Sequence, residues 1–220
     1  MKHGMIAILP LAAGAAVYGF AFGLLAAQVG FPWWGVTLMS SLVHAGSSQI
    51  VAVEQFAGSS AVIGAALAGA ALNLRYIGIV ASLSDVLSGM SLRMKLLTIH
   101  ITGDENWALT MAERARNPAI GAPFLIGSGL VMITVWTGST TLGAVVGSAL
   151  PNLEQFGLGF AFTAAFIAMA RGLWRGHSSL LPWAVSFSVT IGIVLLDMPK
   201  AYAIVAGNLL AKRSSLFSRL

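Results

Sequence analysis

The segment from His44 to Gln49 places polar residues inside an otherwise apolar stretch. Gly46, Ser47, Ser48 and Gln49 combine a loosened backbone with neutral hydrogen-bond donors. Polar residues persist in such stretches mainly where they face a cavity or a partner, because a charge buried in lipid costs about 2.5 to 3.5 kcal/mol. Alternatively, the hydroxyls bond their own backbone and the remaining residues join neighbouring helices. We favour a substrate cavity at this segment.

A second candidate is Asn73-Leu74-Arg75, which follows another apolar stretch. An arginine guanidinium binds a carboxylate through two parallel hydrogen bonds, so Arg75 could clamp an acidic group. An arginine that reaches out to lipid headgroups explains the same residue equally well. We favour a binding role for Asn73 and Arg75, because Arg75 departs from the distribution of the other positive charges.

The acidic pair Asp104-Glu105 is a candidate for carrying protons, because adjacent carboxylates raise one pKa of the pair when they are partly buried. His44 is a further proton-coupling candidate, since the charge of histidine changes near neutral pH. Acidic residues also favour the first turn of a helix, which explains the pair without any chemistry.

A weak internal repeat relates residues 43–49 to residues 135–141. The residues of the second copy that join the candidate substrate-binding set are Trp136, Gly138, Ser139 and Thr140. The two copies are expected to cross in opposite directions, as in transporters built from inverted repeats. In that case Gly46 and Gly138 mark two helix breaks that meet near the bilayer midplane. Chance similarity among small residues is an equally good explanation.

The composition indicates what surrounds these residues. Hydrophobic residues make up 57% of the 220 positions and charged residues only 9%, whereas a soluble domain has about 25% charged residues. The apolar residues run in blocks along the whole chain, so residues 1–220 are expected to form a single transmembrane domain in an all-α integral membrane protein.

Eight apolar segments are candidates for crossing the membrane, which takes about 20 residues each. They are Met5 to Val29, Val36 to Val53, Ala57 to Leu74, Tyr76 to Leu92, Ala119 to Leu150, Phe156 to Ala170, Leu180 to Leu196 and Ala201 to Ala211. Some of them are expected to be broken or re-entrant helices.

The segment from Ala119 to Leu150 would be about 48 Å long as one helix, against a hydrocarbon core of about 30 Å. We therefore expect a break between Trp136 and Thr141, where glycine and hydroxyl residues gather. The polar stretch from Asp104 to Asn117 is expected to be a short helix at the membrane surface. Most lysines and arginines fall on the cytoplasmic side if there are eight crossings, which places both termini in the cytoplasm.

Several classes of function are disfavoured by the same residues. The net charge of +5 is spread out rather than concentrated in basic runs, so nucleic acid is not an expected partner. The chain has no cysteine, which removes disulfides and thiolate metal sites. We expect no cofactor, no metal and no enzymatic activity.

The motifs taken together resemble the AzlC family in order and spacing, from Pro10 to about Phe166. The residues that carry the resemblance are Leu38-Met39-Ser40 leading into Ala45 to Gln49, Asn73 to Arg75, Asp104-Glu105 opening a Trp-Ala-Leu helix, and Trp136 with Thr140 before Gly143-Ala144. The chain departs from the family pattern at Gly103, where threonine is expected, and at His44, where an aromatic residue is common.

The resemblance implies the large subunit of a branched-chain amino-acid exporter, proton-coupled and paired with a small AzlD-like membrane protein. We expect a secondary transporter in the cell inner membrane that exports branched-chain or other small neutral amino acids. Two alternatives stay open: a membrane subunit that only assembles a complex, and a channel for another small solute.

Overall fold

The protein is all-helical in the part of the chain that its computed structural model describes, which is residues 1–59, 62–150, 167, 176–177 and 180–196. This confirms the all-α prediction for those residues. The predicted segments Phe156 to Ala170, apart from residue 167, and Ala201 to Ala211 lie outside the described residues.

Two long helices form the centre of the fold, α2 (Leu9–Gln28) and α9 (Ala122–Ala149). Both are long and apolar enough to cross a membrane. They run parallel and in register, because Gly19 of α2 lies at Ser139 of α9 and Gly23 lies at Gly143. Glycines let the two backbones meet closely, which is how helices pack where water does not drive them together.

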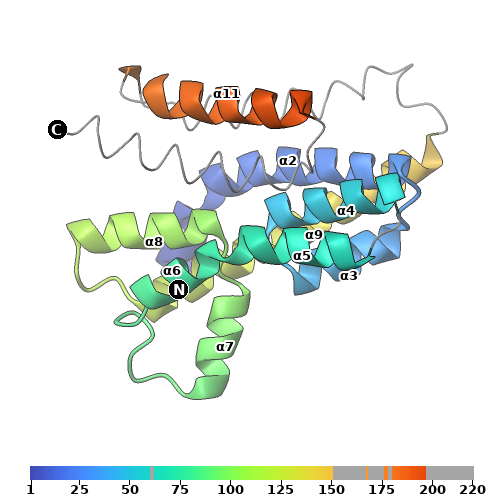
Figure 1. The fold of residues 1–220 in the computed structure, drawn as a ribbon. Coiled ribbons are helices and arrows are strands. Elements are labelled where there is room, and N and C mark those ends of the chain that lie inside the picture. The colour runs from blue at the N-terminus through green and yellow to red at the C-terminus, as the bar shows by residue number, and fades with distance from the viewer. Residues whose placement is uncertain (60–61, 151–166, 168–175, 178–179, 197–220) are drawn as a thin grey trace.

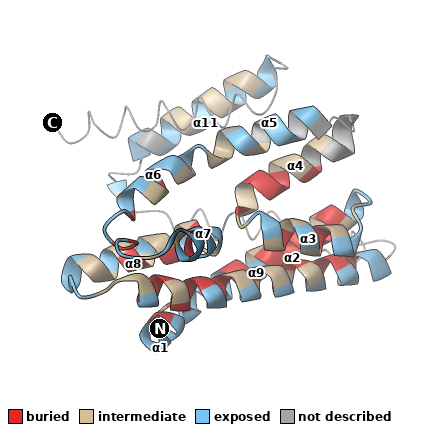
Figure 2. Ribbon diagram, turned by 90° about the horizontal axis from the view of Figure 1, so that it is seen from below, coloured by how far each residue is buried: buried red, intermediate tan, exposed pale blue. Residues whose placement is uncertain are grey.

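Shorter helices complete the first half of the chain. The short helix α1 (Lys2–Ala7) packs against the start of α9, where Gly4 meets the backbone of Phe124. The others are α3 (Trp33–Leu42), α4 (Gly46–Ser59), α5 (Val62–Asn73) and α6 (Arg75–Ser82). Figure 2 shows α2, α3 and α9 in one layer with their buried residues turned toward each other, and α4 and α5 in a second layer.

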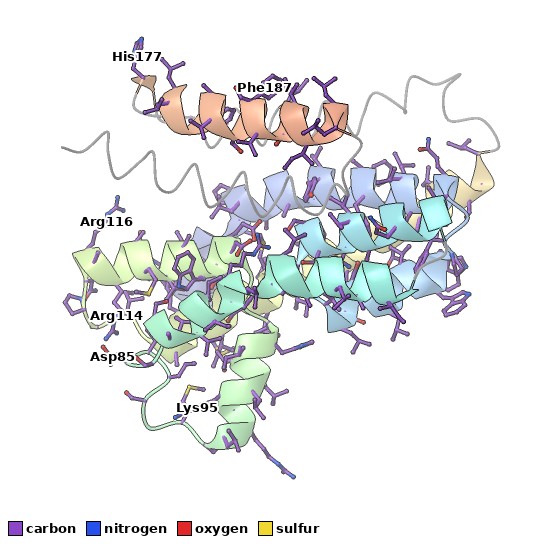
Figure 3. All side chains as sticks on the ribbon, in the orientation of Figure 1. Asp85, Lys95, Arg114, Arg116, His177 and Phe187 are labelled. Atoms are coloured by element: carbon purple, nitrogen blue, oxygen red, sulfur yellow. The ribbon has the colours of Figure 1, made fainter. Side chains whose placement is uncertain are left out.

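Helices α7 (Leu92–His100) and α8 (Asp104–Arg116) lie at one end of the molecule, and α11 (Leu180–Leu195) lies beyond α2 (Figure 1). Figure 3 shows Lys95, Arg114 and Arg116 at the end built by α7 and α8. A second apolar cluster joins this end, where Leu83 and Leu87 pack with Leu125 of α9.

The segment from Val36 to Val53 contains a break, as the sequence predicts. Helix α3 ends at Leu42, Val43 adopts extended backbone angles, and α4 begins at Gly46. This segment also runs in the direction opposite to α9, because Thr37 contacts Thr141 whereas Gln49 contacts Trp136. The descending order of the α9 partners shows that the two segments run antiparallel.

The predicted break between Trp136 and Thr141 is wrong, because α9 is continuous over 28 residues. The hydroxyls of Ser139, Thr140 and Thr141 bond carbonyl oxygens one turn earlier in the same helix. They therefore leave the backbone ladder intact. A helix of this length measures about 42 Å, and tilting accommodates such an excess over the hydrocarbon core.

The prediction of one helix from Tyr76 to Leu92 is also wrong. Helix α6 ends at Ser82, and turns occupy the residues up to Gly89. Ser82 and Ser88 bond nearby carbonyl oxygens, and Gly89 has a φ of 77°. Only glycine adopts such an angle without strain, so the helix cannot continue. In the described part of the chain, α2 and α9 alone have spanning length, and eight crossings stay a prediction.

Candidate functional site

The centre of the site is the break between α3 and α4. A Cβ placed on Gly46 would lie 2.8 Å from the Trp136 ring and 3.1 Å from the Tyr18 ring. Trp136 and Tyr18 stand at the middle of α9 and α2 respectively. If these two helices cross the bilayer, the break lies halfway through it, as the sequence predicts for Gly46.

A buried network of neutral groups joins the break to α9. Gln49 donates from Nε2 to Ser40 Oγ at 3.0 Å and accepts at Oε1 from the Trp136 indole at 2.9 Å. Thr140 Oγ1 lies 2.9 Å from the same Ser40 oxygen. Gln49 is only 1% exposed and Ser40 and Thr140 are fully buried. Both ends of the amide are therefore used, which fixes the orientation of Gln49.

The second half of the site comes from the junction of α5 and α6. Asn73 accepts a hydrogen bond from Ser48 Oγ at 2.8 Å. Arg75 donates from Nη2 to Ser47 Oγ at 3.2 Å and pairs with Asp104 Oδ2 at 2.9 Å. The Arg75 side chain keeps 39% of its surface exposed. A guanidinium with open surface beside a helix break can still receive an anion.

Asp104 and Glu105 form the first turn of α8, as expected of acidic residues at a helix start. The pair also borders the break. Gly103 precedes the pair, and a Cβ there would lie 3.2 Å from His44 Cε1 and 3.4 Å from Glu105 Oε2. Gly103 and His44, the two departures from the AzlC pattern, are therefore in contact. The absence of a side chain at position 103 makes room for the histidine ring.

His44 is held through its backbone and not through its ring. Its carbonyl oxygen accepts a hydrogen bond from the Tyr76 hydroxyl at 2.9 Å. Its ring Nδ1 is buried and has no hydrogen-bond partner among the described residues. Buried polar atoms are usually satisfied, so this nitrogen is a place where a proton or a substrate group could bind.

Two predicted residues lie outside this cluster. Gly138 is exposed, and a Cβ placed there would meet nothing within 4 Å. Ser139 bonds the Trp136 carbonyl and faces Gly19 on α2. Both point away because α9 is unbroken, and successive residues of a continuous helix face different directions. The remaining candidates, Gly46, Ser47, Ser48, Gln49, Asn73, Arg75, Trp136, Thr140, Asp104, Glu105 and His44, come together.

Three site residues were not among the sequence candidates. Ser40 is the shared partner of Gln49 and Thr140, Tyr76 lies under the Arg75 guanidinium at 5.7 Å, and Tyr18 borders Gly46. Ser40 belongs to a stretch that carries the family resemblance, so its position in that motif was a usable signal. Tyr76 and Tyr18 lie in apolar stretches and carry no such signal.

A separate hollow of about 450 Å³ lies where α2 ends beside the end of α9. Its lining residues are Ala27, Gln28, Gly30, Phe31, Pro32, Gly147, Ser148 and Leu150. None of these residues is charged, and the hollow lies away from the polar cluster. We therefore place the candidate site at the break and not here.

In the described residues, two apolar helices of spanning length pack beside a polar cluster at a helix break. A family model described as "AzlC protein" matches residues 10–150. The chain belongs to the AzlC family, as the resemblance indicated.

The relatives of the chain are named as membrane proteins. The "Inner membrane protein YgaZ" of Escherichia coli is 29% identical over 205 residues, which cover 90% of this chain and 82% of that protein. An "Uncharacterized membrane protein" of Helicobacter pylori is 25% identical over 71% of this chain and 68% of its own length. Another of Archaeoglobus fulgidus is 30% identical over 68% and 64% respectively.

No solved structure matches the chain. The family and the relatives together identify this chain as a membrane protein.

Proposed function

We propose that the protein is a secondary transporter of the cell inner membrane that exports branched-chain or other small neutral amino acids. The observation that carries the proposal is the position of Arg75, whose guanidinium meets Ser47 at the helix break with open surface remaining. A membrane protein rarely keeps a positive charge beside a mid-membrane break unless the charge binds something.

The start of α4 offers backbone N–H groups as a second binding element for the substrate carboxylate. The first N–H groups of a helix have no partner within that helix, and Ser47 lies in the first turn of α4. The positive end of a helix favours a carboxylate. A substrate carboxylate at Arg75 would therefore also reach the start of α4.

The walls around the break suit a small uncharged side chain. Ile50 and Val53 of α4 and Met132 of α9 belong to the buried apolar cluster next to the polar network. Neutral donors and acceptors from Gln49 and Thr140 add no net charge beside the break. We infer a substrate whose side chain is apolar and whose charges are confined to its amino-acid head group.

Export against a gradient needs an energy source, and we propose proton coupling through Asp104, Glu105 or His44. These three residues border one another at the break. We also propose a small AzlD-like membrane subunit as partner and both termini in the cytoplasm. No resident cofactor is part of the proposed mechanism, and we do not propose an enzyme.

The test is counterflow in proteoliposomes that contain the purified chain with and without an AzlD-like subunit. Vesicles loaded with unlabelled L-leucine should accumulate external labelled L-leucine, and a panel of charged and neutral amino acids should define the preference. Saturable counterflow distinguishes a transporter from a channel. Vesicles that show neither uptake nor conductance in either preparation would favour an assembly subunit instead.

A further inference from the structure

The two adjacent acids at the start of α8 have different surroundings. Asp104 pairs with Arg75 at 2.9 Å. Glu105 is exposed, and in the described part of the chain it forms no ion pair. Asp104 and Glu105 are adjacent carboxylates with different surroundings, which suggests that they have different roles.

The neighbours of Glu105 come from several elements. Glu105 Oε2 and the His44 ring lie against the same spot, the missing Cβ of Gly103. Tyr18 of α2 and Tyr76 of α6 are close enough to sense the charge of Glu105. The carboxylate therefore faces the break and the middle of α2, on the side where the substrate is proposed to bind.

An amino acid carries its two charges on one carbon atom, so a site for it needs a cation and an anion near each other but not paired. Arg75 and Glu105 meet this condition. Glu105 is close enough to sense the charge of Arg75, yet the ion pair of Arg75 is with Asp104. A zwitterion placed between them would put its carboxylate at the guanidinium and its ammonium group at Glu105.

We propose that Glu105 binds the ammonium group of the substrate or a proton, but not both, while Asp104 is a positioning residue that holds Arg75 for the substrate carboxylate. The inference rests on the proposed function and assigns one task to each charged group of the same site.

Mutual exclusion at one carboxylate determines the direction of coupling. An ammonium group binds the ionised carboxylate, whereas a protonated carboxyl offers no negative charge. A site that holds either ligand but never both exchanges them across the membrane. Entry of a proton would therefore accompany exit of an amino acid, as an exporter driven by the proton gradient requires.

Several neighbouring groups also influence the pH dependence. Asp104 on α8 adds negative charge near Glu105, and Arg75 on α6 adds positive charge. His44 in the break and His100 of α7 are a second pair of titratable groups near this site. An effect of His44 would therefore survive the replacement of Glu105, whereas the effect proposed here would not.

The experiment measures L-leucine binding and proton release by the purified full chain in weakly buffered detergent solution, between about pH 4.5 and pH 7.5. In the wild type, leucine should release up to one proton per molecule bound, and its affinity should fall by about tenfold for each pH unit below the pKa of Glu105. Glu105→Gln should bind leucine more weakly, release no proton and lose this dependence on pH.

The matched control is Glu113→Gln, the same change on the same helix. Glu113 pairs with Arg116 at 3.2 Å, near the other end of α8, so this variant should release protons like the wild type. Proton release from Glu105→Gln equal to that of the wild type would overturn the proposal. So would a wild-type affinity that is constant over the whole pH range.

The two roles separate with analogues of leucine. 4-Methylpentanoate retains the carboxylate and lacks the ammonium group, so Glu105→Gln should bind it as the wild type does and Asp104→Asn should bind it more weakly. The conservative variant Asp104→Glu should recover part of the loss. Equal weakening of leucine and the analogue by Glu105→Gln would refute the assignment of Glu105.

Failure of the proposed function has a different signature. If the wild type shows no counterflow of any amino acid, the substrate class is wrong and this inference falls with it. If counterflow occurs and leucine binding releases no proton at any pH in the range, the function stands and the assignment of Glu105 alone is wrong.

Discussion

The α2–α9 pair and the α3–α4 segment meet at the same place but are built differently. Between α2 and α9 the contact is made by glycines, and neither helix is interrupted. Between α3 and α4 the chain breaks at residues 43–45, and directional hydrogen bonds replace close packing. The comparison suggests that the α2–α9 pair is a rigid scaffold. The α3–α4 segment, held to that scaffold by hydrogen bonds, presents its polar groups at a fixed position along α9.

The largest effect is expected from filling the close contact of the first region. In Gly23→Ala the new Cβ would collide with backbone atoms of Thr140 and Ala144, which cannot rotate away. Overpacking of this kind costs about 1 to 3 kcal/mol or more. Thermal unfolding of the purified protein in detergent should show a clear loss of stability.

The control for that variant is Gly14→Ala on the same helix, where a Cβ meets nothing within 4 Å. Alanine favours a helix over glycine by about 1 kcal/mol, so this change should leave stability unchanged or raise it. Equal destabilisation by both variants would show that α2 does not pack on α9 as described.

The next largest effect is expected from Arg75→Lys in the second region. Lysine keeps the charge but cannot hold Ser47, Asp104 and a substrate carboxylate in one plane. The loss of a charge-assisted hydrogen bond costs about 1.5 to 3 kcal/mol, so leucine counterflow should fall about 10-fold to 100-fold. Arg116→Lys, at the exposed end of α8, should transport normally. Normal flux in both variants would remove Arg75 from the site.

A smaller effect is expected where the two regions join. Trp136→Phe removes the donor to Gln49 and leaves a buried oxygen unsatisfied, which costs about 1 to 3 kcal/mol. Trp107→Phe loses an indole bond to Ser82 at an exposed position, where water can replace it. Chemical unfolding should therefore separate the two variants, and identical stabilities would mean that the Gln49 bond contributes nothing.

The smallest effect is expected from adding one methyl group at the break. In Gly46→Ala the atoms nearest the new Cβ would belong to the side-chain rings of Trp136 and Tyr18 and not to the backbone. The rings must shift to admit it, so leucine transport should fall only a few-fold while the fold is kept. Gly138→Ala places its methyl group in open space and should be silent. A transport loss in Gly138→Ala as large as that in Gly46→Ala would restore the idea of a second break.

The sequence predicted the first break correctly and the second one wrongly, and the reason is physical. Gly46 follows Val43, His44 and Ala45. Val43 and Ala45 have no polar side-chain group, and the His44 Nδ1 has no hydrogen-bond partner among the described residues. Residues 139–141 all carry hydroxyls that bond the preceding turn, so the glycine at 138 weakens the helix without ending it. A pattern of small and hydroxyl residues cannot distinguish these outcomes before the side-chain partners are known.

The candidate site was partly predictable for the same reason. Charged and amide residues are conspicuous in an apolar sequence, so Arg75, Asp104 and Gln49 could be recognised. The pairing of Arg75 with Asp104 in place of Glu105 could not, because the two acids are adjacent in the sequence and have the same type of charged group. Tyr76 and Tyr18 also required the structure, since an aromatic residue in an apolar stretch gives no sign that it borders a polar site.

The hydroxyl contacts between α3 and α9 have a mechanical consequence. Thr37 meets Thr141 at 2.8 Å, and Ser40 meets Thr140 at 2.9 Å, about one turn further along α3. Turning α3 about its axis, or sliding it along α9, would break both contacts together. Helix α3 and the α2–α9 pair should therefore move as one rigid body. Residues 43–45 would then be the hinge about which α4 and α5 swing, and such a swing must break the bonds of Gln49 to Ser40 and Trp136.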